Sequence, residues 1–403
     1  MYTTILRESE QTEMHENYRH LHQHPELSMQ EYRTAEFIED RLDELEVERF
    51  RCGGTGVVGI LRNGDGPTVA FRADTDGLPI QEDTAAVYRS EATGELADGS
   101  IVPVMHGCGH DTHVAAALTA IRVMQRERES WAGTIVWIFQ PGEETAEGAA
   151  AMIADGLWDR APIPEVVLGQ HVFPNSPAGS VALASGDAMA MADSLRITVF
   201  GTQSHGSQPQ NSIDPIVLGA HMVIRLQTIV SRELSPLEQA VVTCGTFHAG
   251  LKENIIPDRA EFTLNIRTLD EAVRERVLAS VTRILNAEAA ASKAPMPRVE
   301  ELYRFPKLFN DPVHTSRVRD ALAAEIGAKR VIAMPAAMGS EDFGSLAQAI
   351  DVPNVYWMFG GFSEDEEAPP VNHSPFFLPE LEPTLTTGVR AAVSALRCYL
   401  SRP

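Results

Sequence analysis

Short runs of consecutive apolar residues, separated by glycine turns and helical stretches, constrain the fold of this chain most strongly. Five of them span residues 57–61, 69–72, 135–139, 166–168 and 355–359. Because successive side chains of a strand point to opposite faces, consecutive apolar residues indicate strands that are buried on both faces. The helices that cover such strands are expected from the helical spacing of apolar residues at 10–46, 112–126 and 146–155. We therefore expect a mixed-sheet α/β domain.

The pattern changes between about residues 193 and 300. Strand-type runs and helical stretches follow one another there at 195–200, 215–231, 240–247, 259–267 and 270–291. This order, β-α-β-β-α, is typical of a ferredoxin-like α+β sandwich. Because single cores stop growing at about 250–300 residues, a chain of 403 residues also favours two domains. We predict a discontinuous domain, 1–190 and 302–403, with an inserted domain at 191–301.

Composition and charge exclude several classes of protein. The chain has 33 basic and 56 acidic residues and a formal net charge of −23, whereas nucleic-acid binders gather basic residues on one face. Its apolar runs are all shorter than the roughly 20 residues that span a membrane. The first 16 residues carry charges where a signal peptide needs an apolar stretch, and the four cysteines are scattered. We expect a cytoplasmic protein that binds neither nucleic acid nor membrane.

The densest group of metal-type donors is the segment MHGCGHDTH at residues 105–113, which leads directly into a predicted helix. It places Cys108 and His110 close together, with His106, Asp111 and His113 around them. Thiolate and imidazole groups suit zinc and the later first-row divalent metals. A buried cysteine with capping histidine and aspartate residues is an equally good interpretation of this segment alone.

Further donors follow the apolar runs. Glu143 and Glu144 come after 135–139, His171 after 166–168, and His373 after 355–359 and a loop. Taken singly, two adjacent glutamates are better explained as an acidic helix start, and a lone histidine as a satisfied polar residue. However, ligands of open α/β sheets bind at the carboxyl ends of the strands, where these donors fall together. By contrast, the histidines at 20, 22 and 24 are two residues apart, which does not place them on one helix face.

Segments in order along the chain, from about residue 20 to 385, resemble the amidohydrolase branch of the M20 metallopeptidase family. This branch includes hippurate hydrolases, N-acyl-amino-acid amidohydrolases and plant auxin-conjugate hydrolases. The matching segments are LHQHPEL (21–27), FRADTDGLPI (71–80), MHGCGHD (105–111), FQPGEE (139–144), GQH (169–171), SH (204–205), NIIP (254–257), MGSEDF (338–343) and NHSP (372–375).

The resemblance implies a catalytic domain that binds two divalent metal ions, zinc or alternatively manganese, nickel or cobalt. The implied ligands are Cys108, His110, Glu144, His171 and His373. Glu143 is implied to be the general base and acid, and Asp76 to orient a ligand histidine. The inserted domain is implied to be a lid that dimerises. From it, His205 is implied to reach the substrate carbonyl across the dimer interface, and Asn254 and Arg267 to help hold the substrate.

We therefore predict a homodimeric amidohydrolase, or a higher homo-oligomer, that hydrolyses the amide bond of N-acyl amino acids. A water molecule activated by the two metals would attack the amide. A dipeptidase or carboxypeptidase of the same family is the alternative enzyme. A non-catalytic homologue that only binds metal or ligand is a third possibility, and the presence of Glu143 beside a complete ligand set argues against it. The segment TQSH at 202–205 departs from the usual pattern of the branch, so the acyl group and the amino acid stay open.

Overall fold

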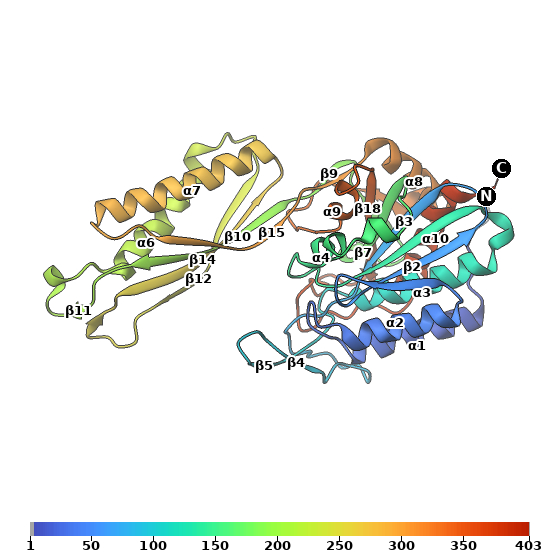
Figure 1. Ribbon diagram of the computed structural model, residues 1–403, viewed down its shortest axis with the longest axis horizontal. Helices are drawn as coiled ribbons and strands as arrows, with labels where there is room; N and C mark the ends of the chain where they lie inside the picture. The colour runs from blue at the N-terminus through green and yellow to red at the C-terminus, as the bar shows by residue number, and fades with distance from the viewer. Residues whose placement is uncertain (1–3, 403) are drawn as a thin grey trace. The chain divides into compact units, whose positions relative to one another are not determined.

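The computed structural model describes residues 4–402, which divide into two compact units (Figure 1). The first unit consists of residues 4–188, 309–336 and 342–402. The second unit consists of residues 189–308 and 337–341. No pattern in the sequence had indicated that the chain returns to the second unit at 337–341. The predicted extent of an inserted domain, 191–301, stays a prediction.

The first unit contains an eight-stranded mixed sheet. In spatial order its strands are β1 (Glu48–Cys52), β2 (Gly56–Asn63), β6 (Gly133–Gln140), β3 (Thr68–Asp74), β7 (Val166–Pro177), β18 (Asn354–Phe362), β8 (Val181–Leu183) and β17 (Val331–Ala333). The central strands β6, β3, β7 and β18 pair in parallel, whereas β1, β2 and β6 pair antiparallel. This arrangement confirms the predicted fold class.

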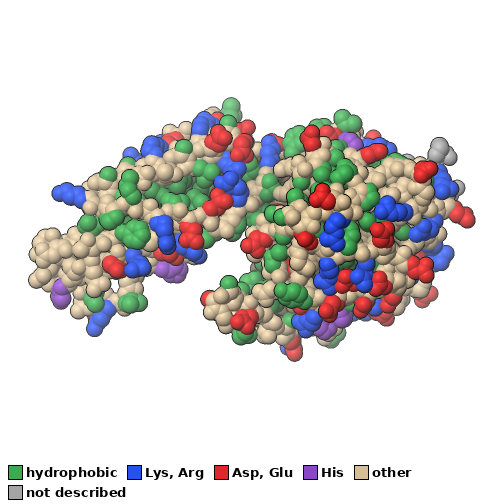
Figure 2. Space-filling view, in the orientation of Figure 1, with side chains coloured by type: hydrophobic (Ala, Val, Ile, Leu, Met, Phe, Trp, Pro, Cys, Tyr) green, Lys and Arg blue, Asp and Glu red, His purple; other side chains and the backbone are tan. Residues whose placement is uncertain are grey.

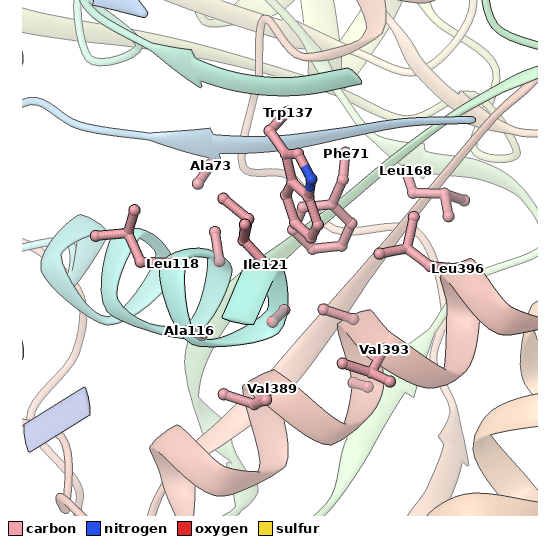
Figure 3. Close-up of a cluster of buried hydrophobic side chains, with 14 of the residues drawn as sticks. Phe71, Ala73, Ala116, Leu118, Ile121, Trp137, Leu168, Val389, Val393 and Leu396 are labelled. Atoms are coloured by element: carbon pink, nitrogen blue, oxygen red, sulfur yellow. The ribbon is translucent and has the colours of Figure 1, made fainter. Parts of the chain in front are cut away.

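Helices cover one face of this sheet and form the main core with it. They are α1 (Glu8–Gln23), α2 (Tyr32–Glu44), α3 (His110–Arg126), α8 (Pro312–Ile326) and α10 (Thr384–Leu400). Phe71, Trp137 and Leu168 of the sheet meet Ile121 of α3 and Val393 of α10 (Figure 3). Each such side chain contributes about 1.5–3 kcal/mol when it is fully buried. This core packs α3 firmly against the sheet.

The opposite face of the sheet is covered by shorter helices. They are α4 (Gly148–Ala154), α5 (Leu157–Arg160) and α9 (Gly344–Gln348). Gly169 of β7 lies directly under the ring of Phe343, where a Cβ atom would come within 2.8 Å of the ring. Residues 69–74 of β3 are all buried, and they include the apolar run predicted at 69–72.

Strand register brings the carboxyl ends of the central strands together. Asp74 at the end of β3 pairs with Gln140 at the end of β6, and Met358 of β18 pairs with His171 of β7. The helix α3 begins at His110, and the hairpin β4 (Thr93–Glu95) and β5 (Ile101–Pro103) precedes it. Polar side chains in the loops after these strands therefore share one edge of the sheet.

The second unit is an antiparallel four-stranded sheet with two helices packed on one face. Its elements in chain order are β10 (Met191–Phe200), α6 (Pro215–Leu226), β12 (Ala240–Ala249), β14 (Arg259–Thr268), α7 (Glu271–Ala291) and β15 (Arg298–Phe305). The spatial order β12-β14-β10-β15 is that of a ferredoxin-like sandwich. Asp214 and Asp270 cap the starts of α6 and α7 by accepting backbone N–H groups. The edge strand β15 is largely exposed and charged, which explains why no apolar pattern predicted it.

The surface carries acidic and basic side chains interspersed over both units (Figure 2). No helix within residues 4–402 is long and apolar enough to cross a membrane.

Candidate metal centre

A tight loop before α3 carries Cys108 and His110 to the carboxyl edge of the first unit's sheet. Gly109 has a φ of +82°, and a Cβ atom at this position would lie 2.5 Å from Val172, so the turn requires glycine. The carbonyl of Gly107 accepts the N–H of His373 at 2.7 Å. This hydrogen bond ties the loop that follows β18 to the cysteine loop.

The glutamate pair lies on a turn directly after β6. Gly142 of this turn has a φ of +55°. The backbone N–H of Glu144 donates to Asp76 at 3.0 Å, which fixes the start of the Glu144 side chain. Glu143 is 6% exposed. The two carboxylates thus arise from one rigid turn.

The five residues that the family resemblance implies as metal ligands come together here. Cys108 Sγ lies 3.4 Å from His171 Nε2, and His373 Nε2 lies 3.3 Å from Glu144 Oε2. His110 Nε2 lies 3.9 Å from Glu144 Oε1. One donor atom from each of Cys108, Glu144 and His373 lies within 4.8 Å of the others, and the same holds for His110, Glu143 and Glu144.

The hydrogen bonds of His171 and His110 leave the Nε2 atom of each ring able to bind a metal ion. His171 Nδ1 donates to the carbonyl of Val172 at 2.6 Å, and His110 Nδ1 donates to Asp76 at 3.1 Å. Their Nε2 atoms are therefore the acceptor atoms of the neutral rings. Within residues 4–402, buried His110 Nε2 and Glu144 Oε1 have no hydrogen-bond partner. Buried polar atoms without partners are costly, and a bound cation would satisfy both of them. The residues present thus fit a metal centre.

Electrostatics in the cluster agree with this fit. Burial, followed by Glu144 and Glu143, raises the pKa of the Cys108 thiol well above its usual range. Burial lowers the pKa of His171 to about 4, which keeps this ring neutral. Burial also lowers the pKa of His110, but Asp74, Asp76 and Glu144 outweigh it and raise the value to about 10. The acidic groups therefore create a negative potential that divalent cations would offset.

Asp74 and its partners form a buried layer beneath the cluster. Arg72 Nη1 donates to Asp74 at 2.5 Å, and both side chains are fully buried. His113 Nδ1 also donates to Asp74, while His113 Nε2 accepts the N–H of Val172 at 2.8 Å. Both ring nitrogens of His113 are thus engaged within the protein, so His113 is not available as a ligand. In the described part of the chain neither ring nitrogen of buried His106 has a partner, and His106 caps no helix.

Sequence reasoning missed two further buried groups beside the centre. His22 is 1% exposed and bridges Asp111 at 2.6 Å and Glu82 at 3.2 Å. Glu31 is fully buried next to the glutamate turn. Arg72 is a third such group, and it could have been noticed beside Asp74, because two charges at alternate positions of an apolar strand share one face. No comparable local pattern distinguishes His22 or Glu31.

The remaining predicted site residues lie in the second unit. His205 is in β11 (Ser204–His205), which pairs with β13 (Ile255–Ile256), and the carbonyl of Asn254 accepts the N–H of Gly206 at 2.8 Å. The structure therefore brings His205 and Asn254 together. Arg267 of β14 donates to the carbonyl of Met338 at 2.8 Å, which anchors residues 337–341 within this unit. A role for Arg267 in holding the substrate stays a prediction.

Comparison with known proteins decides the family. A sequence model of the peptidase family M20/M25/M40 matches residues 70–397. The chain belongs to this family. The N-acetyl-L-cysteine deacetylase of Bacillus subtilis is 36% identical over 344 residues, 85% of this chain and 79% of that protein. Thermostable carboxypeptidase 1 of Saccharolobus solfataricus is 34% identical over 366 residues, 89% of this chain and 88% of that protein.

A solved structure leads to the same family. The Bacillus subtilis YXEP protein, described as a dinuclear metal-binding peptidase of the M20 family, matches with a TM-score of 0.77 at 28% identity. The match covers 96% of this chain and 98% of that one. The predicted family is therefore confirmed, and the dinuclear relative together with the donor cluster supports the binding of divalent metals.

Proposed function

We propose that this protein is a metal-dependent amidohydrolase that cleaves the amide bond of N-acyl amino acids. The observation that carries the proposal is the convergence of five metal-type donors beside the additional carboxylate of Glu143. The predicted class, an enzyme acting on amide bonds, is confirmed by the family and its deacetylase relative. The acyl amino acid as substrate is the finer proposal, and that relative supports it.

Two divalent cations would be held by residues of the first unit. The proposed ligands are Cys108, His110, Glu144, His171 and His373. Bound there, such cations polarise a carbonyl and lower the pKa of coordinated water towards neutrality. The cysteine and histidines favour zinc, while the carboxylate also suits manganese, and nickel or cobalt are further candidates. Asp76 would keep His110 in the tautomer that binds a cation.

Glu143 is the proposed proton-transfer group. It lies on the same turn as Glu144 but outside the proposed ligand set, and its Oε2 atom is 3.9 Å from His110 Nε2. Its carboxylate would accept a proton from the attacking water and return it to the amide nitrogen, since an amine leaves only when it is protonated. The rigid backbone of the turn would keep this carboxylate in place during both transfers.

His205 is the proposed donor to the oxygen of the substrate carbonyl. Its Nδ1 atom accepts the N–H of Ser207 at 3.1 Å, so a neutral His205 ring carries its proton on Nε2. An N–H directed at a developing oxyanion stabilises the transition state of acyl transfer. The inserted domain is proposed to dimerise, so that His205 would act across the interface. Exposed apolar side chains of the second unit, Val241 and Phe247 on the edge strand β12, support a homodimer. A cytoplasmic location is likewise proposed.

A carboxypeptidase or dipeptidase is the second candidate, because a thermostable carboxypeptidase is among the relatives that match nearly the whole chain. Rates of amine release from N-acetyl and N-benzoyl amino acids, measured beside those from dipeptides, separate the two activities. We expect the acyl amino acids to be hydrolysed faster. Faster release from dipeptides would favour the peptidase.

The catalytic assignment is tested by replacing Glu143 with alanine. The Glu143→Ala variant should lose at least about 10²–10⁴-fold in kcat while it retains its metal, because general acid–base transfer contributes on that order. Amine release and metal analysis of the same preparation measure both quantities. Glu147→Ala, which removes an exposed carboxylate four residues away, is the matched control and should keep its turnover. Near-normal turnover of Glu143→Ala would contradict the assignment.

A further inference from the structure

A buried carboxylate that has no cationic partner lies next to the glutamate turn. Glu31 directly precedes α2 and is fully buried. Its Oε1 atom accepts the N–H groups of Met29 at 2.9 Å and Gly142 at 2.8 Å, and its Oε2 atom accepts the Thr55 hydroxyl at 2.5 Å. Across residues 4–402, no arginine, lysine or histidine forms an ion pair with it.

The burial of this group costs free energy that its hydrogen bonds only partly offset. Burial, followed by repulsion from Asp76, raises the pKa of Glu31 to about 7. The carboxylate is the acceptor for two backbone N–H groups and one hydroxyl, and its removal would leave these donors without that acceptor. A requirement for the specific contacts that the carboxylate makes accounts for its presence.

The contact with Gly142 is the one that reaches the proposed catalytic group. Gly142 immediately precedes Glu143, and its φ of +55° is a conformation that favours glycine. Its N–H is held by Glu31, and its carbonyl accepts the N–H groups of Glu147 and Gly148, both at 3.1 Å. A Cβ atom on Gly142 would lie 2.5 Å from the sulfur of Met29, so the same segment also packs against the turn.

The other end of this short segment supports the far side of the turn. The hydroxyl of Ser28 donates to Asp76 Oδ2 at 2.7 Å, and the same oxygen accepts the N–H of Glu144 at 3.0 Å. Residues 28–31 therefore contact both neighbours of Glu143 in the chain. Glu31 binds Gly142 directly, and Ser28 is connected to Glu144 through Asp76. The Glu143 backbone is held from both sides by one stretch of chain between α1 and α2.

We propose that Glu31 is a positioning residue for amide hydrolysis, which it supports by fixing the 141–144 turn that presents Glu143. This inference rests on the proposed function, because Glu31 acts only through Glu143. A general base must stay within about 2.6–3.2 Å of the atom whose proton it takes. A displacement of about 1 Å can cost on the order of 10²-fold in rate. Loss of the Glu31 hydrogen bond frees Gly142 and permits such a displacement.

The first test compares variants of Glu31 in the metal-loaded enzyme with an N-acetyl amino acid as substrate. Glu31→Ala should lower kcat by about 10–100-fold, following the positional argument, with KM and metal content little changed. Glu31→Gln keeps a carbonyl oxygen for the Gly142 N–H and should recover most of kcat. The matched control is Glu325→Ala, which removes another buried carboxylate, bonded to Thr4 and Arg390, and should leave kcat unchanged.

The second test asks whether the effect passes through Glu143. In a Glu143→Ala background, Glu31→Ala should cause no further loss of kcat. A loss equal to that seen in the wild-type background would overturn the inference, because Glu31 would then act independently. If Glu31→Ala does not fold, Glu31→Asp withdraws the carboxylate from Gly142 by one carbon and should show the same loss.

The inference and the proposed function fail in different ways. An active wild-type enzyme whose Glu31→Ala or Glu31→Asp variant keeps full kcat would overturn the positioning role alone. A metal-loaded wild-type protein that releases no amine from acyl amino acids or dipeptides would overturn the proposed function and, with it, this role.

Discussion

His22 should make the stability of the first unit depend on pH. It is buried between Asp111 and Glu82. Burial alone lowers the pKa of His22, but hydrogen bonds to the two carboxylates and their charges outweigh it and raise the pKa to about 9. The ring is therefore a cation at neutral pH and forms an ion pair with both partners.

The magnitude follows from the two pKa values. A rise from the ordinary 6.5 to about 9 corresponds to about 3 kcal/mol of stabilisation by the protonated ring. Because the folded-state pKa is the higher one, this contribution is complete below pH 6.5 and is lost as the pH rises through about 9. His22→Gln removes it, so the gap in unfolding free energy between wild type and variant should shrink by about 3 kcal/mol between pH 6 and about pH 9.5.

Tryptophan fluorescence during urea unfolding measures this difference in unfolding free energy for the first unit, which contains His22. The chain has four tryptophans, at positions 131, 137, 158 and 357, and all of them belong to the first unit. Both proteins are unfolded in the presence of a chelator, so that pH-dependent metal binding does not contribute. The removal of His22 also leaves two carboxylates unpaired, which adds a cost at every pH. The change of the gap with pH is therefore the diagnostic quantity.

A gap that stays constant from pH 6 to about 9.5 would refute the assignment of a cationic His22. His314→Gln is the matched control, because the ring of His314 bonds to the hydroxyl of Tyr399 and forms no ion pair with a carboxylate among the described residues.

Two further predictions concern the metals and the layer beneath them. Chelation should abolish amide hydrolysis and lower the Tm, and added zinc or manganese should restore both. The Tm changes because a cation that binds only the folded state stabilises it. Activity that survives complete metal removal would contradict the proposed centre. Arg72→Met should cost about 3–5 kcal/mol in urea unfolding, because it removes the guanidinium that pairs with the buried carboxylates of Asp74 and Asp342. The exposed Arg62→Met change should cost less than about 1 kcal/mol, and an equal loss in the two variants would contradict the reasoning.

Long apolar runs made the centre of the fold predictable from the sequence. The runs at 69–72, 135–139 and 355–359 lie in β3, β6 and β18, whose two faces are both covered. The strands that the sequence pattern did not predict are short or lie near an edge of their sheet. β1 has a largely charged sequence, and β15 is exposed over nearly its whole length. Such strands form because a neighbour offers hydrogen bonds, which leaves little trace in their own sequence.

The candidate site was predictable for a different reason. Donors that follow the ends of central strands meet because the sheet aligns those ends, and Glu143 and Glu144 follow this rule after β6. His171 lies inside β7, which continues to Pro177, so the predicted strand end at 168 was too early. Glu31 and His22 do not follow it. Each depends on contacts between segments far apart in the chain, such as Glu31 with Gly142, and no local periodicity encodes such a contact. Their roles could be recognised only once the fold had placed these segments side by side.

The position of β18 in the sheet has a consequence for biosynthesis. β18 pairs with β7 on one side and β8 on the other, yet the second unit is translated almost entirely between β8 and β18. While a ribosome translates that stretch, the edge of β7 that later pairs with β18 has no partner strand, and His373 has not yet been made. Unpaired strand edges of nascent chains promote aggregation, and long-range pairing is slow. The first unit therefore cannot complete its sheet until residue 362 has left the ribosome, and the proposed metal centre can be completed only after translation has passed His373.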